Sequence, residues 1–457
     1  MISSCVAGSM RVLSKLQRQG FIKLLLFFFF SQTAFALENI VVTTWQEKSF
    51  LNNEGKTSEV LIKANVENLQ KGYKLTSFGI DFGSENQILI RSVKLDGEIT
   101  KYDFQNGALK VIFPVSKANN EYFSLYISYA EKYHEIHKYL RQEAILIPPF
   151  AKGANAKVII EFPWYLNSAT LNYNIKKSGN SFIYENKVPS SGVREIIKLT
   201  PSQSAWKVLA KTKIKSNKEL KGVSVEIPKY FSHPRQKVEE GNLYASVYPS
   251  KTSKEKNRYK LEFDSNAKEI LMENRANIFI GKQNKTDYLI NPRHYLSYSQ
   301  EDREILEHII YKIKESKKYS NLPLYAKIGE FVHEFITYRR EMVGRRPKIR
   351  EILSNPIGVC TEYATLYNSL ARIAGIPSII LSGLACGEYQ KCEGHVWNMV
   401  YYNNKWIEVD PTWNLMSGIV SSSHVFFSNE EDSGVGSIYP GDGRIIDIEL
   451  DASMTEL

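Results

Sequence analysis

The chain has 457 residues, too many for one hydrophobic core, so we expect two or three domains. Its hydrophobic content of 43% and charged content of 24% exclude a disordered chain, and its 27 Tyr and 22 Phe favour strand-rich structure. Four positive charges of the net +10 lie in residues 1–36, which contain no acid. Subtracting them leaves about +6, which by itself gives no reason to expect nucleic-acid binding.

Residues 1–36 have the three parts of a secretory signal peptide. A basic segment precedes the apolar run Leu24–Phe30, and Ala34-Phe35-Ala36 follows as a cleavage signal. We expect cleavage after Ala36. The apolar run is too short to span a bilayer, which takes about 20 residues, although an uncleaved anchor is the alternative. We therefore expect a periplasmic or secreted protein with no stable membrane insertion after cleavage.

Residues 37–295 are expected to be β-rich, as one sandwich or two modules. Hairpin turns are predicted at Asp96-Gly97 and Asn106-Gly107. Runs of alternating, β-branched or aromatic residues predict strands at Glu59–Asn65, Tyr122–Tyr129, Lys157–Phe162 and Leu171–Ile175. No pattern in this region points to a chemical site.

The pattern changes to helical near Ser297. Ser299 and Asp302 have the spacing of a capping box. One apolar face then follows in each of two helices, formed by Ile305, Ile309, Ile310 and Ile313, and by Ile328, Phe331, Val332, Phe335 and Ile336. We place a domain boundary at about residue 295 and assign residues 296–457 to the second domain.

The segment from Tyr338 to Arg350 contains six cations and one acid. It is interpreted either as a solvated loop or as a patch that attracts anionic substrates to a nearby site, such as material associated with the cell wall.

Cys360 lies where a helix is predicted to begin. Asn355-Pro356-Ile357-Gly358 is a turn just before it, and Gly375 and Pro377 are typical of a helix end. Two adjoining apolar stripes run between these points: Tyr363, Leu366, Leu370 and Ile373, and Cys360, Ala364, Tyr367, Ala371 and Ala374. The N–H groups and dipole at a helix N-terminus favour the thiolate form of a cysteine and can stabilise an oxyanion.

Asn403-Asn404 predicts a two-residue hairpin turn, because Asn tolerates positive φ. Pairing residue 402 with 405 places His395, Trp397 and Asp410 on one face, with Asp410 diagonal to His395. Core residues would occupy the other face: Val396, Val400, Ile407 and Val409. We expect the helix of Cys360 to pack against the His395 face, so that Asp410 orients His395 and His395 activates the thiol.

These blocks match the patterns GVC.EYA.L…L.R.AGIP, GH.WN and W..VDPTW, in that order, over about residues 320–430. In them the chain resembles the transglutaminase-like core of the papain-like cysteine enzyme superfamily. The resemblance implies an α+β protein, in which a sandwich-like β-rich region precedes a papain-like core. In that core, the helix that begins with the cysteine packs on an antiparallel sheet.

The resemblance also implies the roles of three residues: Cys360 as nucleophile, His395 as base and Asp410 as orienting acid. The chemistry of the family is acyl transfer through a thioester, from a glutamine carboxamide or a peptide bond to an amine or to water. It implies a protein or peptide substrate and no organic cofactor; no residue is assigned to a metal, and calcium dependence is left open. The sequence has no D-x-D-x-D-G calcium loop.

The loop Ala385–Glu393 places two cysteines directly before His395. Three cysteines remain after signal cleavage, and in an oxidising compartment the simplest arrangement is a Cys386–Cys392 disulfide with Cys360 as the remaining reactive thiol. Such a bridge could stiffen the entry to the histidine strand or form a wall of the cleft. The alternatives are a zinc site made by Cys360, Cys386, Cys392 and His395, and two free thiols.

Three functions are therefore compared. The first is an exported transglutaminase-like acyltransferase that uses Cys360, His395 and Asp410. The second keeps these residues but transfers the acyl group to water, as a cysteine peptidase or amidase does. The third is a non-catalytic adhesion or scaffold protein whose β-rich half performs the function.

Overall fold

The computed structural model describes residues 40–82, 87–133, 139–169, 174–228, 230, 234–239, 241–254, 258–281, 291–319, 321–343, 348–387, 392–429, 438–439 and 445–457. The expected signal peptide, Arg345 and Arg346 lie outside them, as does most of the strand expected at Leu171–Ile175. None of the helices in the described ranges is long and apolar enough to cross a membrane.

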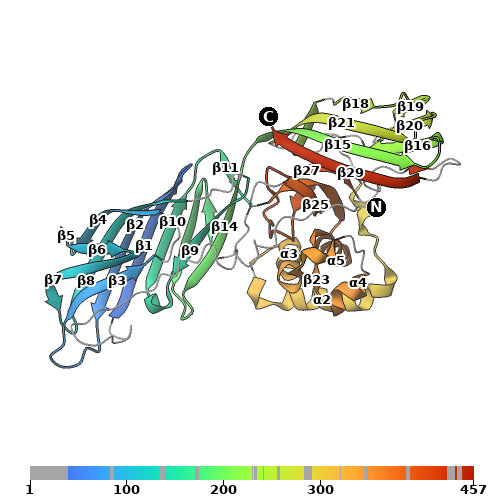
Figure 1. Ribbon diagram of the computed structural model, residues 1–457. Helices are drawn as coiled ribbons and strands as arrows, with labels where there is room; N and C mark the ends of the chain where they lie inside the picture. Colours follow the sequence, from blue (N-terminus) through green and yellow to red (C-terminus); the bar gives the residue numbers. More distant parts are fainter. Residues whose placement is uncertain are drawn as a thin grey trace.

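The first part of the chain is a β-sandwich that extends to one side of the molecule (Figure 1). Its main sheet has the strand order β12-β13-β10-β1-β2-β8-β4-β5. The bounds are β1 Ile40–Leu51, β2 Gly55–Val66, β4 Gln87–Leu95, β5 Glu98–Ile99, β8 Tyr122–Lys132, β10 Asn155–Glu161, β12 Lys176–Ser178 and β13 Ser181–Lys187.

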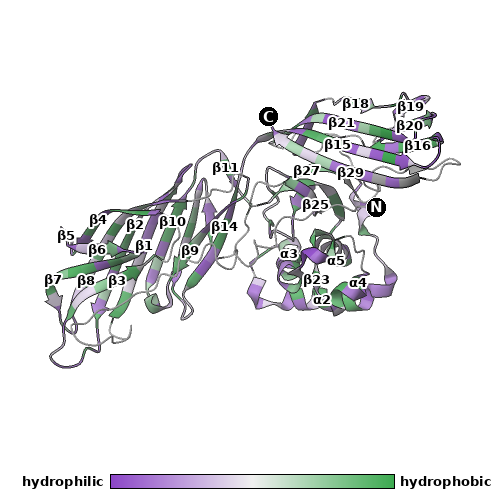
Figure 2. Ribbon diagram, in the orientation of Figure 1, coloured by the Kyte–Doolittle hydropathy of each residue, from purple (hydrophilic) through white to green (hydrophobic). Residues whose placement is uncertain are grey.

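Two three-stranded sheets complete the sandwich, in the orders β11-β14-β9 and β3-β7-β6. Their strands are β3 Leu75–Asp81, β6 Tyr102–Gln105, β7 Ala108–Lys117, β9 Arg141–Ile147, β11 Leu166–Ser168 and β14 Val193–Pro201. Polar and apolar residues alternate along these strands, and the apolar ones share one buried core (Figure 2). Both predicted Asx-Gly turns are present, with positive φ at Asp96, Gly97, Asn106 and Gly107.

A second β module follows, so the β-rich region contains two modules. One sheet has the order β17-β21-β15-β29, with β18 also paired to β21, and the other has the order β19-β20-β16-β28. The bounds are β15 Ser204–Ser216, β16 Lys221–Pro228, β17 Gln236–Glu239, β18 Leu243–Ala245, β19 Lys251–Lys254, β20 Arg258–Asp264, β21 Glu269–Ile280, β28 Ile438–Tyr439 and β29 Ile445–Glu456.

The second domain was expected to comprise residues 296–457, which include strand β29, but β29 belongs to a sheet of the second β module. It comes after the helical core in the chain but pairs with β15 along its length, from Trp206↔Glu456 to Ser216↔Ile445 (Figure 1). Its alternation of polar and apolar residues predicts a strand but not the sheet that it joins, because any free edge offers the same backbone groups.

The core lies between β21 and β28 in the chain. Its helices pack on a four-stranded antiparallel sheet with the order β26-β25-β24-β27. Its helices are α2 Arg303–Glu315, α3 Leu324–Phe335, α4 Ile349–Ser354 and α5 Cys360–Ile373. Its strands are β22 Thr337–Tyr338, β23 Ile357–Gly358, β24 Ser378–Cys386, β25 Cys392–Tyr402, β26 Lys405–Val409 and β27 Val425–Asn429. The protein is thus α+β, with a β-rich region ahead of an α/β core.

The helical faces are partly as predicted. On α3, Ile328 and Val332 are buried, but on α2 the buried residues are Leu306, Ile310 and Ile313, and Ile305 is exposed. The prediction of a capping box at Ser299 and Asp302 is wrong, because the Ser299 side chain makes no cap hydrogen bond. Asp302 instead accepts a hydrogen bond from Arg350 Nε, at 3.1 Å, which joins α2 to α4.

Candidate active site

Cys360 is the first residue of helix α5. Glu362 caps this helix: its Oε2 accepts a hydrogen bond from Val359 N–H at 2.8 Å, although Val359 offers no side-chain acceptor in return. At the other end, Gly375 has φ +80°, and bonds from Gly375 N–H to Arg372 C=O and from Ile376 N–H to Ala371 C=O complete a Schellman motif. Both ends of the helix are therefore fixed by local structure.

The predicted hairpin register is present. Asn403 and Asn404 both have positive φ, and β25 pairs with β26 from Tyr402↔Lys405 to Asn398↔Val409. The ladder ends there, so His395 and Asp410 lie beyond its last pair. Their side chains nevertheless meet, with His395 Nε2 2.9 Å from Asp410 Oδ2 and both groups buried.

This pair fixes the tautomer of His395. An ionised carboxylate only accepts hydrogen bonds, so Nε2 carries the proton and Nδ1 of the neutral ring is left as its basic nitrogen.

The face on which the helix packs was predicted wrongly. Helix α5 covers the opposite side of the sheet: Cys360 and Ala364 cluster with Val396, and Asn398 Nδ2 donates to Ala364 C=O at 3.1 Å. Cys360 thus packs against Val396, the residue that follows His395 on β25. The error has a simple cause: a nucleophile at a helix end can reach the histidine strand while the helix body packs on the other face.

Asp410 is fully buried and accepts four hydrogen bonds. Oδ1 accepts the backbone N–H groups of Thr412, at 2.8 Å, and Trp413, at 3.2 Å. Oδ2 accepts from His395 and also from His424 Nε2, at 3.1 Å. Burial alone would raise the pKa of the Asp410 carboxyl, but the charge and hydrogen bonds of the two histidines bring it well below its usual range. The carboxylate therefore stays ionised.

Four rings surround this carboxylate. Trp413 stacks on His395 with ring centroids 4.5 Å apart, and Trp397 lies nearly parallel to His395 at 6.1 Å. His424 stands edge-on to these rings, at 5.3 Å from His395, 5.0 Å from Trp397 and 4.9 Å from Trp413.

His424 is the residue of this site that sequence reasoning missed. It follows Ser421-Ser422-Ser423 in an irregular segment just before β27, so neither helical nor strand periodicity marks it. The available signal was a single histidine after a serine run, which is too common to point to Asp410.

The structure pairs Cys386 with Cys392 in a disulfide, and of the described cysteines Cys360 is the one outside it. The zinc alternative is therefore excluded in this form, because two of its thiolates are oxidised. Cys386 is fully buried against Trp206 and Val208 of the second β module, so the bridge lies in a packing interface.

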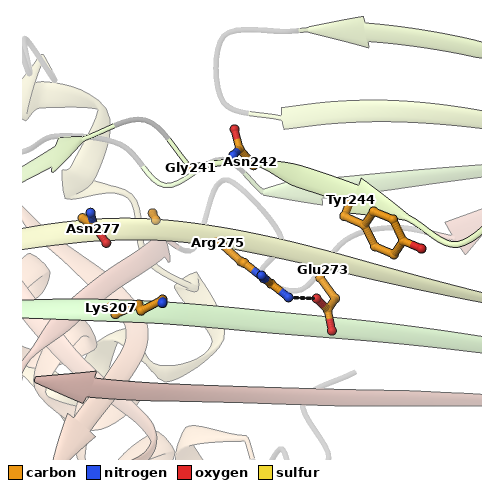
Figure 3. A pocket seen from close by; sticks show the side chains of 8 residues that line it. Lys207, Gly241, Asn242, Tyr244, Glu273, Arg275 and Asn277 are labelled. Atoms are coloured by element: carbon orange, nitrogen blue, oxygen red, sulfur yellow. Dashed lines mark hydrogen bonds and ion pairs between the residues drawn. The ribbon is translucent and has the colours of Figure 1, made fainter. Parts of the chain in front are cut away.

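Two features could be taken for a ligand site: the cluster of His395, Asp410 and His424, and a hollow on the second β module. His395, Asp410 and His424 offer atoms within 4.8 Å of one another, close enough to hold a metal ion, but their mutual hydrogen bonds already account for that closeness. A shallow hollow of about 400 Å³ lies on β21 and β15 of the second module, lined by Lys207, Tyr244, the ion pair Arg275–Glu273, and others (Figure 3). Its lining contains neither a thiol nor an imidazole.

Comparison with known proteins decides the nature of the core. Residues 300–411 match the family model of the transglutaminase-like superfamily. Residues 300–411 form a transglutaminase-like core. A curated relative, kyphoscoliosis peptidase from Mus musculus, is 33% identical over 93 residues, which are 18% of this chain and 14% of that protein. The chain thus spans a small part of that relative.

Similar solved structures include a candidate cysteine protease from Cytophaga hutchinsonii, with 15% identity and a TM-score of 0.39 over 55% of this chain and 92% of that one. Another is leukotriene A4 hydrolase from Saccharomyces cerevisiae, with 14% identity and a TM-score of 0.26 over 42% of this chain and 33% of that one. Likenesses this slight carry no argument. The sequence match places the core in a superfamily of cysteine-dependent enzymes.

The match ends one residue after Asp410, so the segment from Thr412 to His424 lies beyond it. Side chains of both β modules bond this segment. From the sandwich, Lys198 Nζ donates to Trp413 C=O at 2.5 Å, and Thr200 Oγ1 accepts from Ser422 N–H at 2.8 Å. From the second module, Trp206 Nε1 donates to Ser422 C=O at 3.1 Å, and Arg235 Nη1 donates to Val420 C=O at 3.1 Å.

Part of the basic segment reaches the same core. Arg340 Nη2 lies 2.9 Å from Glu393 Oε2, two residues before His395. This guanidinium is thus paired with a carboxylate at the start of the histidine strand. Whether the segment attracts anionic substrates depends on its other cations, two of which lie outside the described ranges.

Proposed function

We propose that the protein is an exported, thiol-dependent acyl-transfer enzyme of the transglutaminase-like type. Cys360 is the nucleophile, His395 the general base and Asp410 the group that orients it. The observation that carries the proposal is the buried His395–Asp410 pair at 2.9 Å, beside the strand residue that Cys360 contacts. Export rests on the signal-like residues 1–36, and the disulfide agrees with an oxidising compartment.

The first half of the reaction makes a thioester. Nδ1 of His395 takes the thiol proton, and the sulfur attacks the carbonyl carbon of a glutamine carboxamide or a peptide bond. The carbonyl oxygen becomes an oxyanion, which the N–H groups of the first turn of α5 stabilise. The imidazolium then gives its proton to the leaving nitrogen, so ammonia or an amine departs and the acyl group stays on Cys360.

The second half returns the thiol. His395 takes a proton from the acceptor, an amine or water, and the acceptor attacks the thioester carbon. The tetrahedral intermediate collapses with expulsion of the Cys360 sulfur, which regains the proton from the imidazolium. Asp410 remains an anion throughout and stabilises the imidazolium in both halves. The residues Cys360, His395 and Asp410 thus account for every proton, and no step requires an organic cofactor.

The acceptor decides between two activities. Water as acceptor would make the protein a cysteine peptidase or amidase, and the name of one relative in sequence, a peptidase, favours this second candidate. An amine acceptor succeeds where water is excluded from the acyl-enzyme. Cys360 and His395 are 5% and 7% exposed, and the half-buried Trp413 covers one face of the His395 ring, which supports a shielded site.

The test combines a thiol-directed acyl probe with a glutamine peptide and a primary amine, followed by mass spectrometry. We expect the probe on Cys360 and, without probe, an amide between peptide and amine. Hydrolysed product alone would move the assignment to the peptidase. Cys360→Ala should lose both products, whereas the control Ser369→Ala, on the same helix, should keep them. Turnover retained in Cys360→Ala would overturn the nucleophile assignment, and absence of both probe labelling and product in the wild-type protein would overturn the proposal in favour of a scaffold role.

A preference for anionic substrates belongs to the same proposal. Neutralising Arg345 and Arg346 should raise KM for an acidic peptide and leave KM for a neutral peptide unchanged. Equal KM values on both peptides would remove this part of the proposal.

A further inference from the structure

His424 is a second histidine on the carboxylate of the candidate triad. Its Nε2 lies 3.1 Å from Asp410 Oδ2, the oxygen that also accepts from His395 Nε2 at 2.9 Å. The residue is 1% exposed, and its Nδ1 has no hydrogen-bond partner among the described residues. A buried imidazole with one nitrogen on a catalytic carboxylate and the other unpaired is unusual enough to require an explanation.

The contacts define the protonation state of His424. Burial lowers the pKa of its imidazole despite the neighbouring carboxylate, so the ring is neutral and carries one proton. That proton lies on Nε2, because a lone pair there would face the lone pairs of Asp410 Oδ2. Nδ1 then presents a bare lone pair to its surroundings, which costs less than a buried N–H without an acceptor.

The position of His424 is set both by the core and from outside it. His424 N–H donates to Ser421 C=O at 3.0 Å, and the three preceding serines are buried and bonded. Ser421 Oγ donates to Tyr139 C=O at 2.9 Å, and Ser423 Oγ contacts both the N–H and C=O of Cys386. The ring is therefore held by backbone groups of the sandwich and of the disulfide strand, as well as by Asp410.

We propose that His424 is a positioning residue that sets the orientation and basicity of His395 through the carboxylate they share. Two donors on one oxygen divide its charge, so Asp410 stabilises the His395 imidazolium less than it would with His395 alone. His424 also holds Oδ2 toward His395, while Thr412 and Trp413 hold Oδ1. The base keeps a fixed tautomer and still releases its proton to the leaving group. This inference rests on the proposed function.

The other charges near His424 are accounted for. Asp410 and His395 face it directly, and Glu408 of β26 influences it but is paired with Arg235, at 3.5 Å. His333 of α3 contacts Pro411 C=O through Nδ1 at 3.1 Å, and Asp410 influences it by charge without a hydrogen bond between the two side chains. Lys198 influences His333 from the sandwich. His395 and His424 are thus the titratable side chains that bond Asp410 in the described ranges.

The test is the pH dependence of Cys360 alkylation by iodoacetamide, which needs no substrate, followed by the pH dependence of kcat/KM. In His424→Leu, Asp410 keeps one histidine, so the His395 imidazole becomes more basic. We expect the pH at which the imidazolium loses its proton, seen as the upper transition of the alkylation profile and the alkaline limb of kcat/KM, to move up by at least half a pH unit. His424→Gln places an amide N–H near the position of Nε2 and should restore the wild-type profile.

His424→Asn provides a second way to remove the donor should the leucine variant fold poorly, because its shorter amide stops short of Asp410. It should behave like His424→Leu. His333→Gln is the matched control: it removes a half-buried histidine that contacts Pro411 C=O, next to Asp410, but not the carboxylate, and its profile should match the wild type.

The outcomes separate the two proposals. Unchanged profiles in folded His424→Leu and His424→Asn would overturn the role of His424 and leave the nucleophile assignment intact. A wild-type Cys360 that iodoacetamide fails to modify at any pH would overturn both. A shift in the glutamine variant as large as in the leucine variant would show that ring packing, not hydrogen bonding, sets the profile, and would also overturn the role.

Discussion

The two sides of the candidate active site are held by different parts of the molecule. On one side, the core alone places Cys360 and His395, through the cap of α5, the hairpin turn and the Asn398–Ala364 hydrogen bond. On the other side, the segment that follows Asp410 is held by side chains of both β modules. The difference gives the β-rich region a physical role, because it orders the half of the site that the core leaves irregular.

The largest effect on activity is expected from a change to Asp410 itself. In Asp410→Asn, the amide N–H₂ can donate to His395 Nε2, which moves the ring proton to Nδ1 and leaves the thiol without a base. We expect kcat to fall by about 10²–10⁴-fold, in line with the effect of this change on a serine-protease triad. Steady-state kinetics would measure it.

Asp302→Asn is the control for Asp410→Asn. Asp302 is also a buried carboxylate, but it bonds Arg350 at the start of α2, and its variant should keep the wild-type rate. A wild-type rate in Asp410→Asn would contradict the role of the pair.

The next effect concerns the contacts from the sandwich. Lys198→Met removes the donor to Trp413 C=O, and Thr200→Val removes the acceptor of Ser422 N–H. Each hydrogen bond contributes about 1 kcal/mol, so we expect kcat/KM to fall about five-fold in each variant. Lys207→Met, on the exposed hollow of the second module, should have no effect (Figure 3). Equal activity in all three would show that the core orders this segment by itself.

The disulfide should matter for stability rather than for rate. Cys386→Ser with Cys392→Ser opens a loop with a sequence separation of 6, and chain-entropy estimates for such a loop give about 2 kcal/mol of unfolding free energy. Denaturant unfolding would show a lower midpoint, with kcat within about two-fold of the wild type. A loss of activity in the folded double variant would instead make the bridge a wall of the cleft.

The smallest effect is on the pH dependence of stability. The pKa of His424 is lower in the folded protein than its ordinary value of about 6.5, so the unfolded chain binds a proton first and stability falls as pH drops below that value. His424→Gln should flatten this loss by at most about 1.4 kcal/mol per pH unit. Unfolding midpoints between pH 7 and 5 would measure the slopes. An unchanged slope would show that folding does not lower the pKa of His424.

Local signals were sufficient for the elements that carry Cys360 and His395. Asn403-Asn404 specified the turn and with it the register, and Gly375 marked the end of α5, because both depend on the backbone freedom of single residues. These are short-range effects, and a single sequence records them directly.

Long-range packing could not be predicted in the same way. The side of the sheet that α5 covers is decided by tertiary packing: the sequence marked Val396, Val400, Ile407 and Val409 as a core face, but not that α5 is the element that buries it. His424 was missed for a related reason: its bond to Asp410 is set by serines that bind Tyr139 and Thr200, residues more than 200 positions away. The C-terminal strand likewise gave no sign of its partner.

The pairing of β29 with β15 bears on the order in which the molecule is made. Strand β15 emerges from the ribosome well before the core, whereas its partner β29 emerges only after the core. The second module therefore cannot complete its sheet until the core has been synthesised. Until then Trp206 and Arg235 belong to an incomplete scaffold. If the anchors act as argued, thiol reactivity during refolding should appear together with the closure of this sheet and not with the earlier formation of α5.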